Sequence, residues 1–374
     1  MLEQYVCRGT ERLRCGYTTG SCATAAAKAA AWMLLAGQIR DDISIMTPKG
    51  IELRLKVVDA ACKDGEASCA VIKDSGDDPD ITNGIKIYAR VERSVSGIQI
   101  RGGCGIGIVT RGGLDQPKGS AAINSTPRKM ITLALEDVAE QFQYDGGLLV
   151  TIYAPEGIAL AKKTFNPAIG IEGGISIIGT SGIVEPMSTK ALLDTIELEI
   201  RQHRTEGDVR LVLTLGNYGR TFVQNEYPEL LDRAVTCSNY IGDAIDMALE
   251  NGYQEIVIIG HIGKLVKLGA GIMNTHSAQA DGRMEVLAGC GLRAGVDADI
   301  LRQILDCVTV DEAIGLLDQS GMRENVIEIL LCRIQYYLDA KVKHTIPIHA
   351  VLFSNRYGML GISHAEQTTD IKGE

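Results

Sequence analysis

Gly173-Gly174-Ile175-Ser176-Ile177-Ile178-Gly179-Thr180-Ser181-Gly182 is the stretch of sequence that decides the expected fold. Its apolar centre predicts a short buried strand, and its small residues predict a loop where that strand ends. An amphipathic helix is expected from about Ser188 to His203, with Ile196 and Ile200 on its apolar face. A strand, a loop and a helix in this order are typical of the start of an α/β domain, in which ligands bind where the strands end.

Two later segments repeat this pattern. Val209 to Leu215 is predicted to be an apolar strand that ends in Gly216-Asn217-Tyr218-Gly219. Glu255 to Ile259 is predicted to be another, and it ends in Gly260-His261-Ile262-Gly263-Lys264. Because helical segments separate the strands, we expect a mostly parallel sheet whose three glycine-rich loops share one edge.

The residues before the opening stretch predict another kind of domain. An alanine-rich helix is expected from about residue 20, with Thr and Ser at its start and Gly37 after its end. Short alternating runs between Ile43 and Ile108, separated by turns, predict a mixed or antiparallel sheet. A second helix is expected to begin at Pro127. This part of the chain is therefore expected to be α+β.

Composition and charge exclude several classes of function. The 374 residues are 45% hydrophobic and 22% charged, which is enough apolar sequence for two folded domains. A net charge of -10 argues against a general nucleic-acid binder, which needs clustered Lys and Arg. The lack of a basic leader and of a long apolar run predicts a cytoplasmic protein that does not span a membrane. The ten cysteines are scattered, so we expect reduced thiols and no metal site.

Three groups of residues could meet a ligand, and each has a purely structural alternative. The helix start at Thr18 to Ser21 offers amides to an anion, or is ordinary capping of a buried helix. The acidic loop from Asp74 to Asp80 could face a ligand, or be a polar turn. His261 could shuttle a proton and Lys264 could bind a carboxylate, or they are a capping histidine and a solvated lysine.

Five motifs taken together are more specific than any of these groups alone. They are Gly16-Tyr17-Thr18-Thr19-Gly20-Ser21-Cys22-Ala23, Asp74-Ser75-Gly76-Asp77-Asp78-Pro79-Asp80, Ala122-Ile123-Asn124 with Pro127-Arg128, Gly170-Ile171-Glu172-Gly173-Gly174-Ile175-Ser176 through Pro186-Met187-Ser188, and Gly260-His261-Ile262-Gly263-Lys264. Together they resemble the cobalt-precorrin-5B C(1)-methyltransferase family, known as CbiD. The resemblance implies methyl transfer from S-adenosylmethionine to ring carbon 1 of cobalt-precorrin-5B, which gives cobalt-precorrin-6A in anaerobic cobalamin (vitamin B12) biosynthesis. The cobalt would then belong to the substrate.

The expected organisation follows from these observations. Residues 1–170 would form the α+β domain and act as a substrate clamp, and residues 171–374 would form a Rossmann-like α/β domain that binds S-adenosylmethionine. The expected cofactor-binding residues are Gly179, Thr180, Ser181, Gly182, Gly216, Asn217 and Gly260. The expected substrate-binding residues are Thr18, Thr19, Ser21, Asp77, Asp78, Arg101, Arg111, Arg128 and Lys264. If the reaction needs a proton acceptor, His261 is the expected residue.

Two other functions stay open at this point. A nicotinamide-dependent corrinoid oxidoreductase would use the same kind of pocket, although the G-x-G-x-x-G loop typical of nicotinamide sites is missing. A non-catalytic corrinoid-binding protein would only hold the macrocycle. The sequence also leaves open whether the chain forms a homo-oligomer and whether neighbouring pathway enzymes hand over the substrate.

Overall fold

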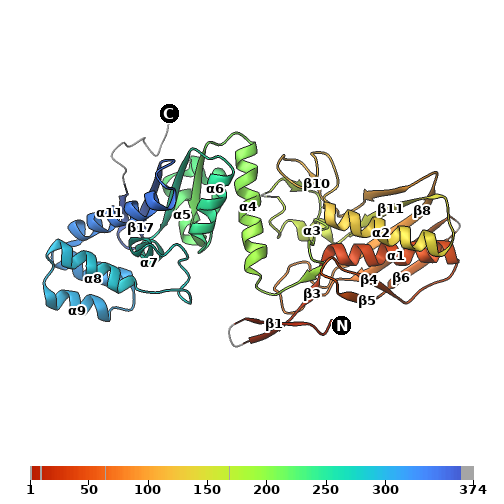
Figure 1. Cartoon of the computed structure of the whole chain (residues 1–374), viewed down its shortest axis with the longest axis horizontal. Coiled ribbons are helices and arrows are strands. Elements are labelled where there is room, and N and C mark those ends of the chain that lie inside the picture. Colours follow the sequence, from red (N-terminus) through yellow and green to blue (C-terminus); the bar gives the residue numbers. More distant parts are fainter. Residues whose placement is uncertain (1, 9–10, 64, 168, 364–374) are drawn as a thin grey trace. The chain divides into compact units, whose positions relative to one another are not determined.

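The chain folds into two compact units (Figure 1). The computed structural model describes residues 2–8, 11–63, 65–167 and 169–363. Unit 1 ends at Thr189 and unit 2 begins at Lys190. The fold is mixed α/β and contains several separate sheets. Within the described ranges, no helix combines the length and the apolar composition that crossing a bilayer would need.

Unit 1 combines one five-stranded sheet with several two-stranded ones. Its elements are β1 (Tyr5–Arg8), β2 (Glu11–Arg14), β3 (Gly16–Tyr17), α1 (Thr19–Ala36), β4 (Asp42–Met46), β5 (Glu52–Lys56), β6 (Val58–Lys63), β7 (Glu66–Ile72), β8 (Lys86–Ser94), β9 (Ile98–Gly102), β10 (Ile108–Val109), α2 (Ser125–Gln141), β11 (Gly147–Tyr153), α3 (Gly157–Ala161), β12 (Ile171–Glu172) and β13 (Ile183–Val184). The large sheet has the order β6-β7-β8-β11-β9. Its pairs are antiparallel except β11 with β9, so the sheet is mixed, as the sequence predicts.

Helix α1 forms the centre of unit 1, where it packs on the large sheet and beside α2 (Figure 1). Thr18 caps its start by accepting a hydrogen bond from Ser21 N, and Gly37 ends it with a left-handed φ of 67°. Most of its alanines are fully buried. Because an alanine side chain is a single methyl group, the sheet and α2 can both approach the helix closely.

Unit 2 is built on a mostly parallel sheet. Its elements are α4 (Thr189–Thr205), β14 (Arg210–Thr214), α5 (Gly216–Glu226), η1 (Pro228–Arg233), β15 (Ala234–Thr236), α6 (Ile241–Glu250), β16 (Glu255–His261), α7 (Ile262–Leu265), η2 (Val266–Ala270), α8 (Arg283–Ala294), α9 (Ala298–Asp306), α10 (Val310–Gln319), α11 (Arg323–Lys341), β17 (Ile348–Ser354) and β18 (Gly358–Ile362). The strand order is β15-β14-β16-β17-β18. Strand β18 is antiparallel to its neighbour, and the other pairs are parallel.

Helices cover both faces of the unit 2 sheet. On one face, Leu211 and Ile256 share a hydrophobic core with residues of α6, α8, α10 and α11. On the other face, Val212 and Val257 share a core with Val223 of α5. Strands β14 and β16 are neighbours in the sheet. The chain continues from β14 to β15 on one side of this pair and from β16 to β17 on the other side. A crevice for a ligand is expected where two such neighbouring strands end.

The stretch Gly173–Gly182 lies in unit 1, which differs from the expected domain boundary after residue 170. Ile175 and Ile177 are buried in the core of unit 1. Each makes a single parallel bridge to another segment of that unit. The apolar segment therefore finds its partners in the first unit, and the parallel sheet of the second unit begins later, at β14.

Helix α4 contains a half-buried carboxyl group, that of Glu199. Burial raises the pKa of this group from 4.5 to about 7, and the charge of Arg220 opposes the shift. The folded state thus binds this proton more tightly than the unfolded state. The contribution of Glu199 to stability is complete below pH 4.5 and is lost as the pH rises to about 7. We expect Glu199→Gln to stabilise unit 2 by about 1–3 kcal/mol near pH 8 and to change little near pH 4.

Urea denaturation at the two pH values, followed by far-ultraviolet circular dichroism, measures this difference. An equal gain in the free energy of unfolding at both pH values would contradict the expectation, since a glutamine that merely packs better would stabilise unit 2 at any pH.

Candidate functional site

The segments that follow β14 and β16 meet at the carboxyl edge of the unit 2 sheet. The two strands are paired in parallel along their length, so Gly216, which follows β14, and His261, the last residue of β16, lie at the same edge. A Cβ atom on Gly216 would lie 3.8 Å from Lys264 Nζ. The structure therefore brings together four expected site residues, namely Gly216, Asn217, His261 and Lys264.

The start of α5 at this edge is suited to an anion. Gly216 has a left-handed φ of 63°, no side chain caps the helix, and its first turn contains no acidic residue. The first N–H groups of a helix have no acceptor within the helix and carry partial positive charge. The amides of Gly216 and Asn217 can therefore receive a carboxylate or a phosphate.

His261 caps the short helix α7, as one of the alternatives drawn from the sequence predicts. Its Nδ1 atom accepts a hydrogen bond from Gly263 N at 3.1 Å. Its Nε2 atom lies 3.6 Å from Asp311 Oδ2. Burial lowers the pKa of His261, and the charge of Asp311 opposes this shift. The imidazole is therefore neutral near pH 7 and is held between a backbone amide and a carboxylate.

Lys264 presents an ammonium group at the same edge. The side chain is half-buried, and burial lowers its pKa. Among the residues that the structure describes, no hydrogen-bond acceptor or carboxylate pairs with Lys264 Nζ. Lys264 therefore differs from the solvated lysine that the purely structural alternative predicts. A partly desolvated cation without a partner is suited to binding a ligand carboxylate.

Gly260 is buried in the core next to the ligand edge. It is buried within β16. A Cβ atom at this position would lie 3.0 Å from Leu265 and 3.3 Å from Leu215. The missing side chain thus makes room for neighbouring leucines, which is a packing role that sequence alone does not distinguish from close approach to a ligand.

The start of α1 in unit 1 is occupied by the chain itself. Thr18 N donates to Gly182 O at 3.1 Å, and Ser21 Oγ donates to the same oxygen at 2.7 Å. Thr19 Oγ1 hydrogen-bonds to the backbone of the same segment. A Cβ atom on Gly179 would lie 2.2 Å from Thr18 Oγ1. These groups therefore hold the loop against the helix, in agreement with the capping alternative.

The expected cofactor loops do not share one sheet edge. The loop from Gly179 to Gly182, which includes Thr180 and Ser181, belongs to unit 1 and follows no strand of the parallel sheet. The loops at Gly216 and at His261 are both on the carboxyl edge of unit 2. The expectation of three loops at one edge is therefore corrected to two, because the opening stretch packs in another core.

The acidic loop is mainly a structural turn. Asp77 Oδ2 accepts a hydrogen bond from Arg14 N at 2.6 Å. Asp78 Oδ1 accepts one from Met187 N at 3.1 Å. Each carboxylate thus ties the loop to another segment of unit 1, as the polar-turn alternative predicts.

The three expected arginines belong to three different segments of unit 1. Arg128 is half-buried and donates to Ile123 O at 2.8 Å and to Ile100 O at 3.4 Å. Burial lowers its pKa, and the charge of Asp115 opposes the shift. Arg101 is exposed on β9, and Arg111 is exposed in the loop after β10.

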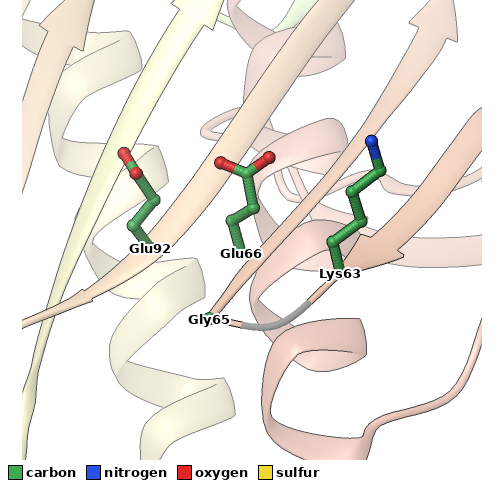
Figure 2. Close-up of a pocket in the computed structure, with 4 residues that line it drawn as sticks. All are labelled: Lys63, Gly65, Glu66 and Glu92. Atoms are coloured by element: carbon green, nitrogen blue, oxygen red, sulfur yellow. The ribbon is translucent and has the colours of Figure 1, made fainter.

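A surface hollow on the large sheet of unit 1 contains none of the expected residues. Lys63, Glu66 and Glu92 line it from the neighbouring strands β6, β7 and β8, together with Gly65 (Figure 2). Two of its three charged groups are acidic, so it is poorly suited to a substrate rich in carboxylates. In the described parts of the chain, no group of three or more His, Cys, Asp or Glu side chains is arranged to hold a metal ion.

Asp311 and Ser354 contact the site but are absent from the expected residues. Ser354 is the last residue of β17, the neighbour of β16. Its place follows from parallel pairing, because the late strand of the chain ends at the same edge as the others. Asp311 stands in the first turn of α10. No local motif marks it, since only the packing of the C-terminal helices brings it to His261.

The chain is similar to proteins of one family along most of its length. The CbiD family model matches residues 7–186, and the model of the CbiD C-terminal domain matches residues 274–364. A cobalt-precorrin-5B C(1)-methyltransferase from Ruminiclostridium cellulolyticum is 46% identical over 95% of this chain and 92% of the relative. A protein of the same name from Alkaliphilus metalliredigens is 42% identical over 98% of this chain and 96% of the relative.

The chain is also similar to a cobalamin biosynthesis protein (cbiD) from Archaeoglobus fulgidus whose crystal structure is known. The two sequences are 29% identical, and the match covers 75% of this chain and 87% of that chain with a TM-score of 0.40. The decisive findings are the two family models and the curated relatives that align with nearly the whole sequence. The chain belongs to the CbiD family.

Proposed function

We infer that the chain is a cobalt-precorrin-5B C(1)-methyltransferase, an enzyme of cobalamin biosynthesis. In this reaction, a methyl group passes to C-1 of the macrocycle and gives cobalt-precorrin-6A. The observation that carries the function is the identity of 46% with a relative of that name over 95% of the chain. A match of this extent favours the enzyme over the corrinoid carrier and over the nicotinamide-dependent oxidoreductase.

We assign the binding of S-adenosylmethionine to unit 2, as a Rossmann-like domain. Numbered in chain order, its strands follow the pattern 2-1-3-4-5, and sheets of this order bind ligands where the first and third strands end. In unit 2 these strands are β14 and β16. The uncapped start of α5 and the unpaired Lys264 at their ends fit the carboxylate of the cofactor. When bound, the cofactor supplies a methyl group on a sulfonium.

The residues of the chain would act by aligning the cofactor and the substrate. A methyl group on a sulfonium already has a good leaving group, so the reaction needs no nucleophilic side chain and depends on the placement of the reactants. The amides of Gly216 and Asn217 and the ammonium of Lys264 would fix one carboxylate at the edge of unit 2. Such fixed points restrict the reactants to productive orientations.

We assign the clamping of the substrate to the arginines of unit 1. The macrocycle carries many carboxylates, which guanidinium groups bind well. Arg101 and Arg111 are exposed, and Arg128 is half-buried with its carbonyl contacts on Nε and Nη1. The hydroxyls of Thr18 and Ser21 are used within unit 1, so they contribute to the fold and not to the clamp.

Methyl transfer tests the function directly. When the full chain is incubated with cobalt-precorrin-5B and methyl-labelled S-adenosylmethionine, we expect the label to appear in the macrocycle, detected by chromatography with mass spectrometry. Tight binding of the macrocycle without transfer of label would favour the carrier. A reaction that proceeds only with a nicotinamide nucleotide would favour the oxidoreductase. The matched control is the same reaction with protein that has been heat-denatured.

A further inference from the structure

We propose that His261 is a positioning residue. Its imidazole, which is held by Asp311, caps α7 and thereby keeps the Lys264 ammonium in place to bind a carboxylate of a ligand. That carboxylate belongs to one of the reactants of methyl transfer, so the identity of the ligand rests on the proposed function. The role differs from that of the proton acceptor expected from the sequence.

The contacts of the two ring nitrogens favour one tautomer of His261. Nδ1 accepts a hydrogen bond from Gly263 N at 3.1 Å. A neutral imidazole has one accepting nitrogen, so the proton lies on Nε2, which is 3.6 Å from Asp311 Oδ2. Asn355 N–H is also directed at Nε2, at 3.4 Å, and is the longer of the two backbone contacts of the ring. The shorter contact at Nδ1 and the carboxylate at Nε2 outweigh this contact, and both favour the Nε2–H form.

Asp311 is itself held in one orientation. Ser354 Oγ donates to Asp311 Oδ1 at 2.8 Å. Ser354 is 2% exposed, and its oxygen also accepts hydrogen bonds from Arg356 N at 3.0 Å and Tyr357 N at 3.2 Å. All the hydrogen-bonding capacity of this hydroxyl is therefore used. The end of β17 thus fixes the carboxylate that faces His261.

The same contacts leave His261 poorly suited to accept a proton. A general base needs a free lone pair within reach of the substrate. The lone pair of Nδ1 is directed at Gly263 N, and in the favoured tautomer Nε2 carries the proton. The rings of Tyr218 and Phe353 flank the imidazole. In the described part of the chain, Asp311 is the charged group that faces the ring.

The cap connects His261 to Lys264. Helix α7 runs only from Ile262 to Leu265, so one lost capping bond affects a large part of it. Lys264 lies directly after Gly263, whose N–H forms that bond. The ammonium ends beside Gly216 and has no acceptor among the described residues. Fixing α7 therefore fixes an unpaired cation at the ligand edge.

Two substitutions of His261 separate positioning from proton transfer. Asparagine is a good capping residue, so His261→Asn should keep kcat and KM within about threefold of the unsubstituted chain. Alanine cannot cap, so His261→Ala should weaken binding of the carboxylate ligand about 3- to 10-fold and change kcat less. A proton acceptor would show the opposite pattern, because its loss lowers kcat by about 100-fold or more in both variants. Such a kcat loss in His261→Asn would overturn the proposal.

Lys264→Met identifies the carboxylate. Calorimetric titration with S-adenosylhomocysteine reports on the cofactor, and titration with cobalt-precorrin-5B reports on the macrocycle. We expect one of the two dissociation constants to rise about tenfold or more, and the same one to rise less in His261→Ala. If Lys264→Met weakens neither, the cation binds no reactant and the proposal is wrong.

A measurement without turnover completes the test. In the full chain with ¹⁵N-labelled histidine, long-range ¹H–¹⁵N spectra near pH 7.5 should show His261 as the Nε2–H form. Asp311→Ala should give a mixture of tautomers, whereas Asp299→Ala, at an exposed aspartate of α9, should not. A dominant Nδ1–H form in the unsubstituted chain would overturn the proposal. Absence of methyl transfer together with the Nε2–H form would instead refute the proposed function and leave the positioning intact.

Discussion

Asp80→Ala is expected to lower the free energy of unfolding of unit 1 by about 3–5 kcal/mol. The side chain of Lys73 is 2% exposed, and its Nζ atom lies 2.6 Å from Asp80 Oδ2. Its other contact is Ser75 Oγ. Burial would raise the pKa of Asp80, but the charge and hydrogen bond of Lys73, together with the hydrogen bonds from Thr82, outweigh burial, and the pKa lies below its usual value. Removal of the carboxylate would leave a buried ammonium with only a hydroxyl as partner, which is costly.

Tryptophan fluorescence during urea denaturation measures this loss. Trp32 is the only tryptophan of the sequence and lies in α1, so its signal reports on unit 1. Asp42→Ala is the control, because its ion pair with Arg54 is exposed and worth about 0–1 kcal/mol. Adding Lys73→Met to Asp80→Ala should recover most of the stability. If Asp80→Ala costs no more than the control, Lys73 does not remain buried and charged.

Gly179→Ala is expected to destabilise unit 1 by about 2–6 kcal/mol, from a strained backbone and from overpacking. Gly179 has a φ of 139°, a conformation that side chains rarely adopt. A Cβ atom there would lie 2.2 Å from Thr18 Oγ1, which caps α1. The substitution would therefore also displace the cap of the central helix.

Gly173→Ala separates strain from the steric clash. Gly173 also has a left-handed φ, of 79°, but a Cβ atom there would meet no atom within 4 Å. We expect it to cost about 1–2 kcal/mol, measured by Trp32 fluorescence as above. Equal losses in the two variants would show that the contact with Thr18 is not important. The comparison also tests the corrected place of this stretch, which the sequence assigns to the second domain.

Local signals predict the elements of this chain well. The alanine run with Thr18 before it and Gly37 after it predicts α1, and the structure confirms both caps. The apolar strands that end at Leu215 and Ile259 are followed by helices, and this order predicts the parallel pair β14 and β16. Each prediction depends on residues close in the sequence, whose conformational preferences act before any distant contact forms.

Distant contacts determine what local sequence signals leave open. Ile175 and Ile177 have the composition of a core strand, but nothing near them tells which core will contain them. Gly179 and Gly260 are predicted to approach a ligand, and in the structure their missing side chains make room for Thr18 and Leu265. A glycine required for packing and a glycine required for ligand approach look the same in a sequence.

Strand β17 lies next to β16 in the sheet, yet helices α8 to α11 are made between them. During synthesis, β16 therefore keeps an unpaired edge until the C-terminal strand leaves the ribosome. Pairing across such a long segment of chain is slow, because the loop must close before the contacts form. Unit 2 should thus be the later unit to fold in the cell. It should also depend more on chaperones, until its last strands are synthesised.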